Sequence, residues 1–259
     1  MRLLSLMCLA IFILILSIPT FAGNCGDVNN DTSINIFDIT HLISYLYMEG
    51  LEPDCGLDNI IGTVTDIDGN LYYTVKIGDQ WWMLENLKVT QYRNGDPIPN
   101  VTDNGQWGSL STGAYCNYNN DESKVAIYGR LYNWFAVNDS RNIAPEGWHV
   151  PSDAEWQTLI DYLGGNSHSG GKMKDTGLDY WLSPNEGATN EGNFTALPSG
   201  YRYPDGSQYY GLKYQAHFWS TTESITGNAW TRYLLYNNIA SYRYTSWKEN
   251  GFSVRCVKD

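Results

Sequence analysis

The sequence from residue 60 onward predicts an α+β domain of short antiparallel strands and two helices. Three observations predict it. Apolar runs alternate with tight-turn dipeptides between residues 62 and 84, a capping box followed by helical spacing starts at residue 152, and short strand-like runs punctuated by Gly, Asn and Ser follow residue 194.

The first of these regions predicts a three-stranded meander. Its runs cover residues 62–65, 71–77 and 80–84, and Asp68-Gly69 and Gly78-Asp79 separate them. Asp-Gly is the dipeptide that type I′ hairpin turns prefer. Asp66 and Asp68 could instead be metal ligands, but the turn explains both, so we favour the hairpin.

The clearest strand-to-helix junction lies at residues 147–156. The strand around Trp148 ends at Pro151, which cannot donate to a sheet, and Ser152 with Glu155 forms a capping box. An apolar helical face follows, made by Trp156, Leu159, Ile160 and Leu163, and Gly164-Gly165 ends it. We interpret Asp153 and Glu155 as stabilisers of the helix N-terminus rather than as catalytic groups.

Helical spacing also marks residues 128–137, where Leu131, Trp134 and Phe135 predict a second helix that pairs with the first. Strands are expected at residues 218–220, 230–236, 239–244 and 252–257.

Residues 1–22 have the features of a signal peptide. One positive charge, Arg2, precedes an apolar run over residues 3–18, and small residues Thr20 and Ala22 approach the expected cleavage point. A membrane anchor is the alternative, but the run is short for a span and no stop-transfer charges follow it. We therefore expect a secreted or cell-surface protein with no membrane span after signal cleavage.

The formal charge of -12 argues against nucleic acid as a partner, since phosphate binding needs a basic face. After signal cleavage four cysteines remain, an even number that favours disulfides in an exported protein. Of the three pairings we favour Cys25–Cys55 and Cys116–Cys256, because each would close one module.

A calcium loop is predicted between residues 27 and 38. A twelve-residue loop supplies oxygen ligands from positions 1, 3, 5, 7, 9 and 12. Here these positions are Asp27, Asn29, Asp31, Ser33, Asn35 and Asp38, and an EF-hand-like helical pattern follows up to Gly50. The alternative is a polar turn before a capped helix.

Residues 26–47 resemble one repeat of a type I dockerin, a calcium-binding module whose partners are cohesins. The resemblance implies Ca²⁺ as the cofactor, a repeat over residues 23–50, a linker over 51–59 and a cohesin-like partner. This sequence departs from the family because nothing after Leu51 repeats the pattern and because Thr32 replaces the usual Gly at loop position 6.

Residues 60–259 resemble the Fibrobacter succinogenes major paralogous domain. Four motifs carry the resemblance: TVKIGDQWWMLENL at 74–87, YNW at 132–134, APEGWHVPSDAEW at 144–156 and GFSVRCV at 251–257. The last two are also similar, more distantly, to C-type-lectin-like and formylglycine-generating-enzyme folds, which implies an α+β domain with two helices and irregular antiparallel sheets.

We therefore predict a secreted binding or adhesion protein, associated with an extracellular polysaccharide, whose aromatic side chains stack on sugars. Surface candidates are Tyr201, Tyr203, Tyr209, Tyr210, Tyr214, Tyr242 and Tyr244, in preference to Trp148 or Trp156. One alternative is a calcium-dependent tether that docks through residues 24–50. A second is a carbohydrate-active enzyme, whose carboxylate pair would come from Asp153, Glu155, Glu191 or Glu223, although no pair stands out.

Overall fold

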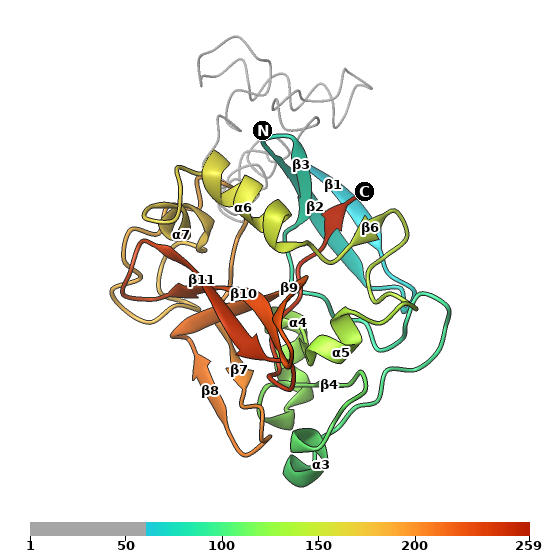
Figure 1. Cartoon of the computed structure of the whole chain (residues 1–259). Coiled ribbons are helices and arrows are strands. Elements are labelled where there is room, and N and C mark those ends of the chain that lie inside the picture. Colours follow the sequence, from blue (N-terminus) through green and yellow to red (C-terminus); the bar gives the residue numbers. More distant parts are fainter. Residues whose placement is uncertain (1–60) are drawn as a thin grey trace, which may run out of the picture. The chain divides into compact units, whose positions relative to one another are not determined.

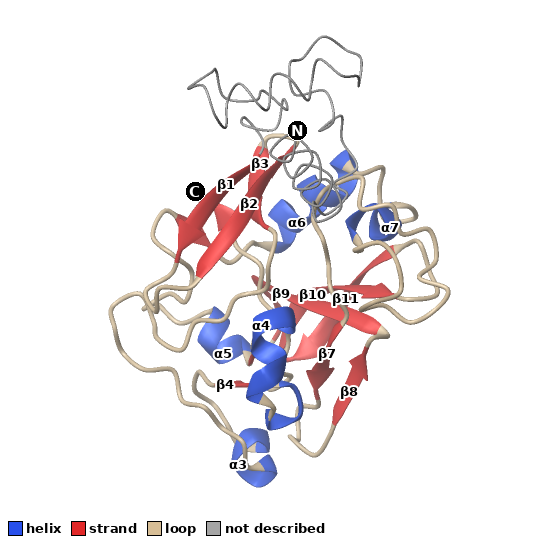
Figure 2. Ribbon diagram, turned by 180° about the vertical axis from the view of Figure 1, so that it is seen from behind, coloured by secondary structure: helices blue, strands red, loops and turns tan. Residues whose placement is uncertain are grey.

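The computed structural model describes residues 61–259 (Figure 1). The predicted signal peptide, calcium loop, linker and Cys25–Cys55 disulfide lie outside the described residues. Within the described part no helix has the length and apolar character needed to cross a bilayer. The described residues form a β-rich α+β domain of curled sheets with few helices (Figure 2).

The first sheet contains the predicted meander. Its strands run in the order β1 (Ile61–Thr65), β2 (Leu71–Ile77), β3 (Gln80–Met83), β12 (Val257–Lys258) and β6 (Trp148–His149). All its pairings are antiparallel. The hairpin interpretation of Asp66 and Asp68 is confirmed, because both lie in the β1–β2 connection and accept hydrogen bonds within the protein. The type I′ turn at Asp68-Gly69 is wrong, since the Gly69 N–H donates to the Asp66 carbonyl and only Gly69 of the two has positive φ.

The second sheet contains the longest strands. Its order is β11 (Ser241–Trp247), β10 (Asn228–Leu235), β9 (Gln215–Ile225), β7 (Ser199–Arg202) and β8 (Tyr209–Leu212). Only the β7–β9 pair is parallel. Three of the predicted C-terminal strands are thus confirmed. A third, two-stranded sheet joins β4 (Tyr115–Cys116) to β5 (Leu131–Tyr132).

The helix after residue 152 is confirmed as α6 (Asp153–Tyr162), and both hydrogen bonds of the Ser152–Glu155 capping box are present. It packs against β9 and β10. The other helical segments are short: α3 (Asn104–Gly108), α4 (Val125–Tyr128), α5 (Trp134–Val137), α7 (Ser169–Met173), and 3₁₀ turns at Tyr118–Asn120 and Glu122–Lys124.

The continuous helix predicted over residues 128–137 is wrong. Gly129 has φ of 72° and ends α4, the chain then enters β5, and α5 begins at Trp134. A Cβ atom at Gly129 would lie 2.6 Å from Cβ of Asn86, so only glycine allows this close approach. The predicted pairing with α6 is also wrong, since α5 packs against β9 and Trp134 belongs to a different core cluster from Trp156.

The Cys116–Cys256 disulfide is a further wrong prediction, because both residues are free, buried thiols. They lie in separate core clusters. Cys116 packs with Trp107 and Tyr118, whereas Cys256 packs with Met83 and Tyr92. The prediction rested on the even number of cysteines. That number does not show whether two cysteine side chains lie close enough to form a disulfide.

Residues 251–258 connect all three sheets. Phe252 bridges to Tyr132 of β5, Ser253 bridges to Phe218 of β9, and Val257 pairs with both Trp82 of β3 and His149 of β6. The expected strand at 252–257 is therefore a series of single bridges followed by β12. Arg255 is fully buried here and donates to backbone carbonyls of Met83, Phe194 and Thr195 and to the side-chain oxygen of Asn86.

Candidate functional site

A row of aromatic side chains crosses the second sheet. In strand order it consists of Tyr242 on β11, Tyr233 on β10, His217 on β9, Tyr201 on β7 and Tyr210 on β8. Tyr242 lies opposite Tyr233, Tyr233 opposite His217, and Tyr201 opposite Tyr210. The parallel pairing of Gly200 with Ala216 brings Tyr201 beside His217, with ring centroids 4.7 Å apart. We call these five residues the aromatic row.

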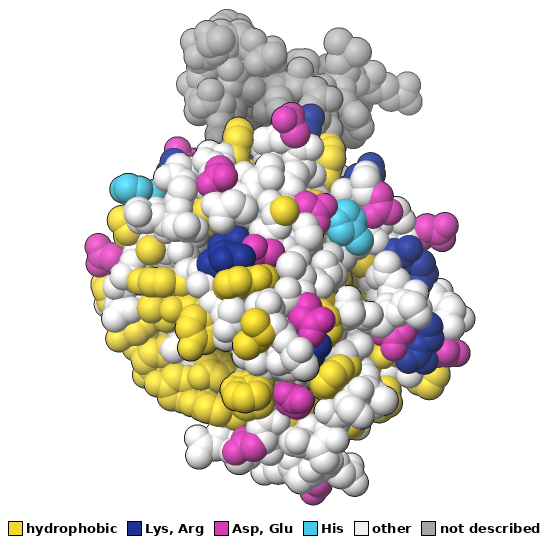
Figure 3. Space-filling view, in the orientation of Figure 1, with side chains coloured by type: hydrophobic (Ala, Val, Ile, Leu, Met, Phe, Trp, Pro, Cys, Tyr) yellow, Lys and Arg dark blue, Asp and Glu magenta, His cyan; other side chains and the backbone are white. Residues whose placement is uncertain are grey.

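The row forms because strand side chains alternate between the two faces of a sheet. Positions that alternate with the row, namely Arg202, Arg232 and Arg243, point to the other face. There Arg232 and Arg243 pair with Asp153 of α6. The row itself contains no Asp, Glu, Lys or Arg, whereas farther along β9 Glu223 lies opposite Ala229 and pairs with Lys248. Figure 3 shows a broad patch of hydrophobic side chains over the area that β7, β8, β10 and β11 occupy in Figure 1.

The inner rings of the row stack on one another. Tyr233 and Tyr242 are 4.7 Å apart with an angle of 8° between ring planes, and His217 and Tyr233 are 5.2 Å apart at 16°. Phe252, which is buried, covers His217 from the other side at 4.9 Å and 23°. The ring faces of Tyr233 and His217 are therefore occupied by their neighbours.

Tyr210, at the β8 end of the row, and Tyr244 and Tyr203, which flank the row, are oriented differently. Tyr210 meets Tyr201 edge to face at 70°, and Tyr244 meets Tyr233 at 82°. Tyr210 is 52% exposed and Tyr244 is 61% exposed. Tyr203 lies beside Tyr201, tilted by 40°, and is also exposed. These three tyrosines present accessible ring surface to solvent.

His217 and Tyr233, in the middle of the row, carry no charge near neutral pH. Burial lowers the pKa of His217 to about 3, so its imidazole is neutral. Its Nε2 atom lies 2.8 Å from Oε1 of Gln215, while its buried Nδ1 has no partner among the described residues. Burial raises the pKa of Tyr233, with smaller contributions from Tyr242 and Tyr244, so its hydroxyl stays protonated.

The predicted surface tyrosines are mostly found where the sequence placed them. Tyr203, Tyr210, Tyr214 and Tyr244 are exposed, whereas Trp148 and Trp156 are buried. Tyr209 points away from the row, since it packs on Tyr118. His217 and Tyr233 were not predicted as site residues. The period-two alternation of β9 and β10, which places both on the face of Tyr242, is the signal that could have found them.

The four carboxylates considered for catalysis are all held in ion pairs. Arg232 and Arg243 bind Asp153 at 3.0 and 2.8 Å, Lys172 binds Glu191 at 3.3 Å, and Lys248 binds Glu223 at 2.6 Å. Glu155 accepts from the backbone and hydroxyl of Ser152, both at 2.7 Å, and contacts His149 Nε2 at 2.7 Å. Glu155 thus caps the N-terminus of α6 as predicted, and Asp153 lies in its first turn.

His149 links this helix terminus to Asp259, whose Oδ1 lies 2.6 Å from Nδ1 of the imidazole. Burial opposes the charged imidazolium, but the hydrogen bonds to Asp259 and Glu155 outweigh it and raise the pKa of His149. Burial likewise works against ionisation of Glu155, and its bonds to Ser152 overcome this and lower its pKa. The cluster thus stabilises the contact between β6 and α6.

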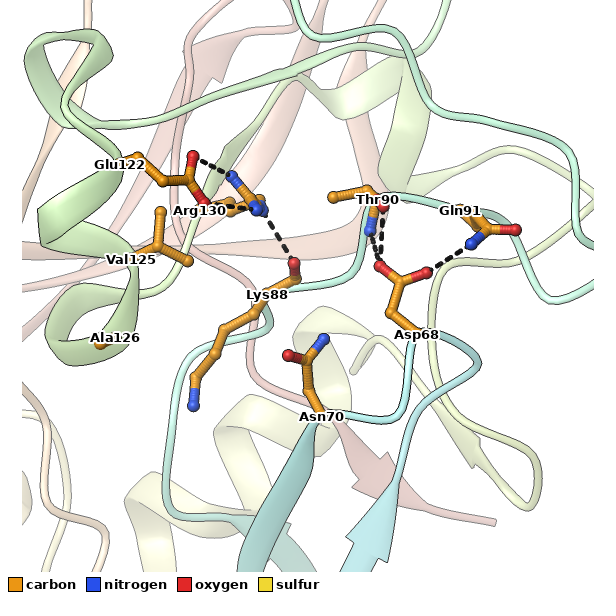
Figure 4. A pocket seen from close by; sticks show the side chains of 9 residues that line it. All are labelled: Asp68, Asn70, Lys88, Thr90, Gln91, Glu122, Val125, Ala126 and Arg130. Atoms are coloured by element: carbon orange, nitrogen blue, oxygen red, sulfur yellow. Dashed lines mark hydrogen bonds and ion pairs between the residues drawn. The ribbon is translucent and has the colours of Figure 1, made fainter.

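A pocket of about 690 Å³ lies between the β1–β2 connection, residues 88–91 and α4 (Figure 4). Its carboxylates are already bound. Asp68 accepts from Thr90 Oγ1 at 2.8 Å and Gln91 Nε2 at 2.7 Å, and Glu122 pairs with Arg130 at 3.0 Å. No group of three or more His, Cys, Asp or Glu side chains that could hold a metal ion occurs in residues 61–259. The aromatic row is therefore the stronger candidate site.

Fold and surface together define a β-rich α+β domain with a row of aromatic side chains across one sheet face. Residues 75–258 match the family described as Fibrobacter succinogenes major domain. The chain belongs to this family, which is not a known catalytic family. No curated protein and no solved structure matches the chain.

Proposed function

We propose that this is a secreted or cell-surface binding protein whose aromatic row holds an extracellular neutral polysaccharide. The observation that carries the proposal is the aromatic row across all five strands, with exposed Tyr210 at its β8 end and exposed Tyr244 beside its β11 end. Tyrosine combines an apolar ring with a hydroxyl, which suits a ligand that has both C–H faces and hydroxyl groups.

The finer parts of the proposal rest on sequence. They are a non-catalytic, C-type-lectin-like or formylglycine-generating-enzyme-like fold for residues 60–259, and an EF-hand-like, dockerin-like Ca²⁺ loop with Asp27, Asn29, Asp31, Ser33, Asn35 and Asp38 as ligands. In this arrangement the calcium repeat would anchor the chain to a partner while the larger domain binds polysaccharide.

A pull-down of the full chain on insoluble cellulose, mannan and xylan tests the proposal. We expect retention on at least one polymer, and retention should fall when Tyr210 or Tyr244 is replaced by alanine. Tyr162→Ala is the matched control, because Tyr162 is 66% exposed but lies on α6, outside the row. Absence of retention on every polymer, or equal losses with Tyr162→Ala, would contradict the proposal.

A second candidate function is a calcium-dependent tether, which the ligand spacing between Asp27 and Asp38 favours. A pull-down from culture supernatant distinguishes it. Loss of a protein partner on chelation, unchanged by Tyr210→Ala and Tyr244→Ala, supports the tether, whereas a chelator-resistant partner argues against it.

A further inference from the structure

We propose that the ligand of the aromatic row is a linear, neutral polysaccharide that lies across the strands and is bound along the interior of its chain. The inference rests on the proposed function and adds the form of the ligand and its direction on the sheet. It follows from the orientation of the rings rather than from their number.

Sugars stack on the flat faces of aromatic rings, and the middle of the row has no such face to offer. Tyr233 lies between Tyr242 and His217, with nearly parallel planes on both sides. Phe252 and Tyr233 enclose His217 in the same way. The middle of the row can therefore present only ring edges and hydroxyls, which make hydrogen bonds but not stacking contacts.

Accessible ring faces occur at two separate places. Tyr244 on β11 is one, turned 82° from Tyr233, and Tyr210 on β8 is the other, turned 70° from Tyr201. Tyr203, next to Tyr201, extends the second. We call Tyr244 the β11 platform, and Tyr210 with Tyr203 the β8 platform.

The distance between the platforms sets the length of the ligand. β11 and β8 are the first and last strands of the five-stranded sheet, so four interstrand spacings separate them. At about 4.8 Å each, these spacings add up to roughly 19 Å. A monosaccharide or disaccharide is too short to touch both platforms, whereas a longer linear chain reaches both and passes over the ring edges between them.

Charge favours a neutral chain over an acidic polymer or a polypeptide. His217 is neutral and the row contains no Asp, Glu, Lys or Arg, while the sequence as a whole has a net charge of -12. An acidic polymer would be repelled by the whole chain without meeting a cation in the row. Polypeptide partners usually match charged groups on the surfaces they cover, and the row has none to match.

The test uses soluble oligosaccharides of the polymer retained in the pull-down, from the monosaccharide to the hexasaccharide, titrated calorimetrically into the full chain. We expect affinity to rise at least tenfold from disaccharide to hexasaccharide and then to level off. Tyr244→Ala and Tyr210→Ala should each weaken hexasaccharide binding about fivefold, the effect of losing one stacking contact of roughly 1 kcal/mol. The two losses should multiply in the double variant, because the platforms are too far apart to share a contact.

Each failure has a separate meaning. Retention on the polymer with the same affinity for all oligosaccharide lengths overturns the inference and leaves the proposed function in place. A double variant no weaker than either single variant does the same. Tyr162→Ala should bind like the unmodified chain, and circular dichroism should show every variant folded. Sedimentation that reveals a dimer, dissociated by Tyr244→Ala and without sugar binding, would show that a second copy covers the row and would refute both proposals.

Discussion

Replacing Ser152 with alanine tests the structural interpretation of the strand-to-helix junction. The Ser152 hydroxyl accepts from the Glu155 backbone at 3.2 Å and donates to the Glu155 carboxylate at 2.7 Å. Loss of an N-cap hydroxyl typically costs about 1 kcal/mol, and the bond to a charged acceptor moves the expected cost toward 2 kcal/mol. The backbone bond from Ser152 to Glu155 remains in the variant and limits the loss.

Tryptophan fluorescence during thermal or urea unfolding measures this cost cleanly, because all ten tryptophans lie between residues 81 and 247 and report on this domain alone. The melting temperature should fall by about 2–4 °C for each kcal/mol lost. Glu155→Ala should cost more than Ser152→Ala, since it also removes the partner of His149. The double variant should cost less than the sum of the two.

Two results would refute the reasoning. One is a Ser152→Ala variant as stable as the unmodified chain, which would mean that the cap contributes nothing. The other is a fully folded Ser152→Ala variant that no longer binds polysaccharide, which would move the junction from a structural to a functional role.

Three further outcomes are expected. Burial lowers the pKa of His217 from 6.5 to about 3, so its contribution to stability is complete above pH 6.5 and is lost as the pH falls toward 3. The free energy of unfolding should change with pH by at most about 1.4 kcal/mol per pH unit on this account. Urea unfolding of His217→Phe should show a weaker dependence of stability on pH over this range, and an unchanged dependence would contradict a neutral, buried His217. Cys116 and Cys256 should react with a thiol reagent only after unfolding, since both are buried and burial raises the pKa of Cys116 to about 11. Because both are free thiols, a reductant should leave the melting temperature of the domain unchanged. Calorimetric titration should detect Ca²⁺ binding that Asp27→Ala and Asp31→Ala abolish, whereas calcium uptake by both variants equal to that of the unmodified chain would count against the loop.

Local signals in the sequence predicted the local structure well. Asp68-Gly69 and Gly78-Asp79 place the turns of the meander, and Ser152 with Glu155 places the start of α6. Each of these signals depends on residues within one turn of each other, so no distant contact was needed to interpret it.

The failures have a common cause in distant contacts. The helical spacing of Leu131 and Trp134 is real, but Gly129 approaches Asn86 and Leu87, and β5 pairs with β4, so tertiary contacts override the local pattern. The aromatic row was only half predicted for the same reason. Tyr201, Tyr210 and Tyr242 could be named from composition, but the register that stacks Tyr233 on His217 depends on strands paired across the sheet.

Residues 251–258 also constrain when this domain can form. They supply the bridges to Tyr132, Phe218 and Trp82, and Arg255 closes the space between Met83 and Phe194. The contacts with Tyr132, Trp82 and Met83 join positions more than a hundred residues apart, and such long-range contacts make folding slow. The first sheet therefore cannot be completed until residues 251–258 have been synthesised, because β12 joins β3 to β6.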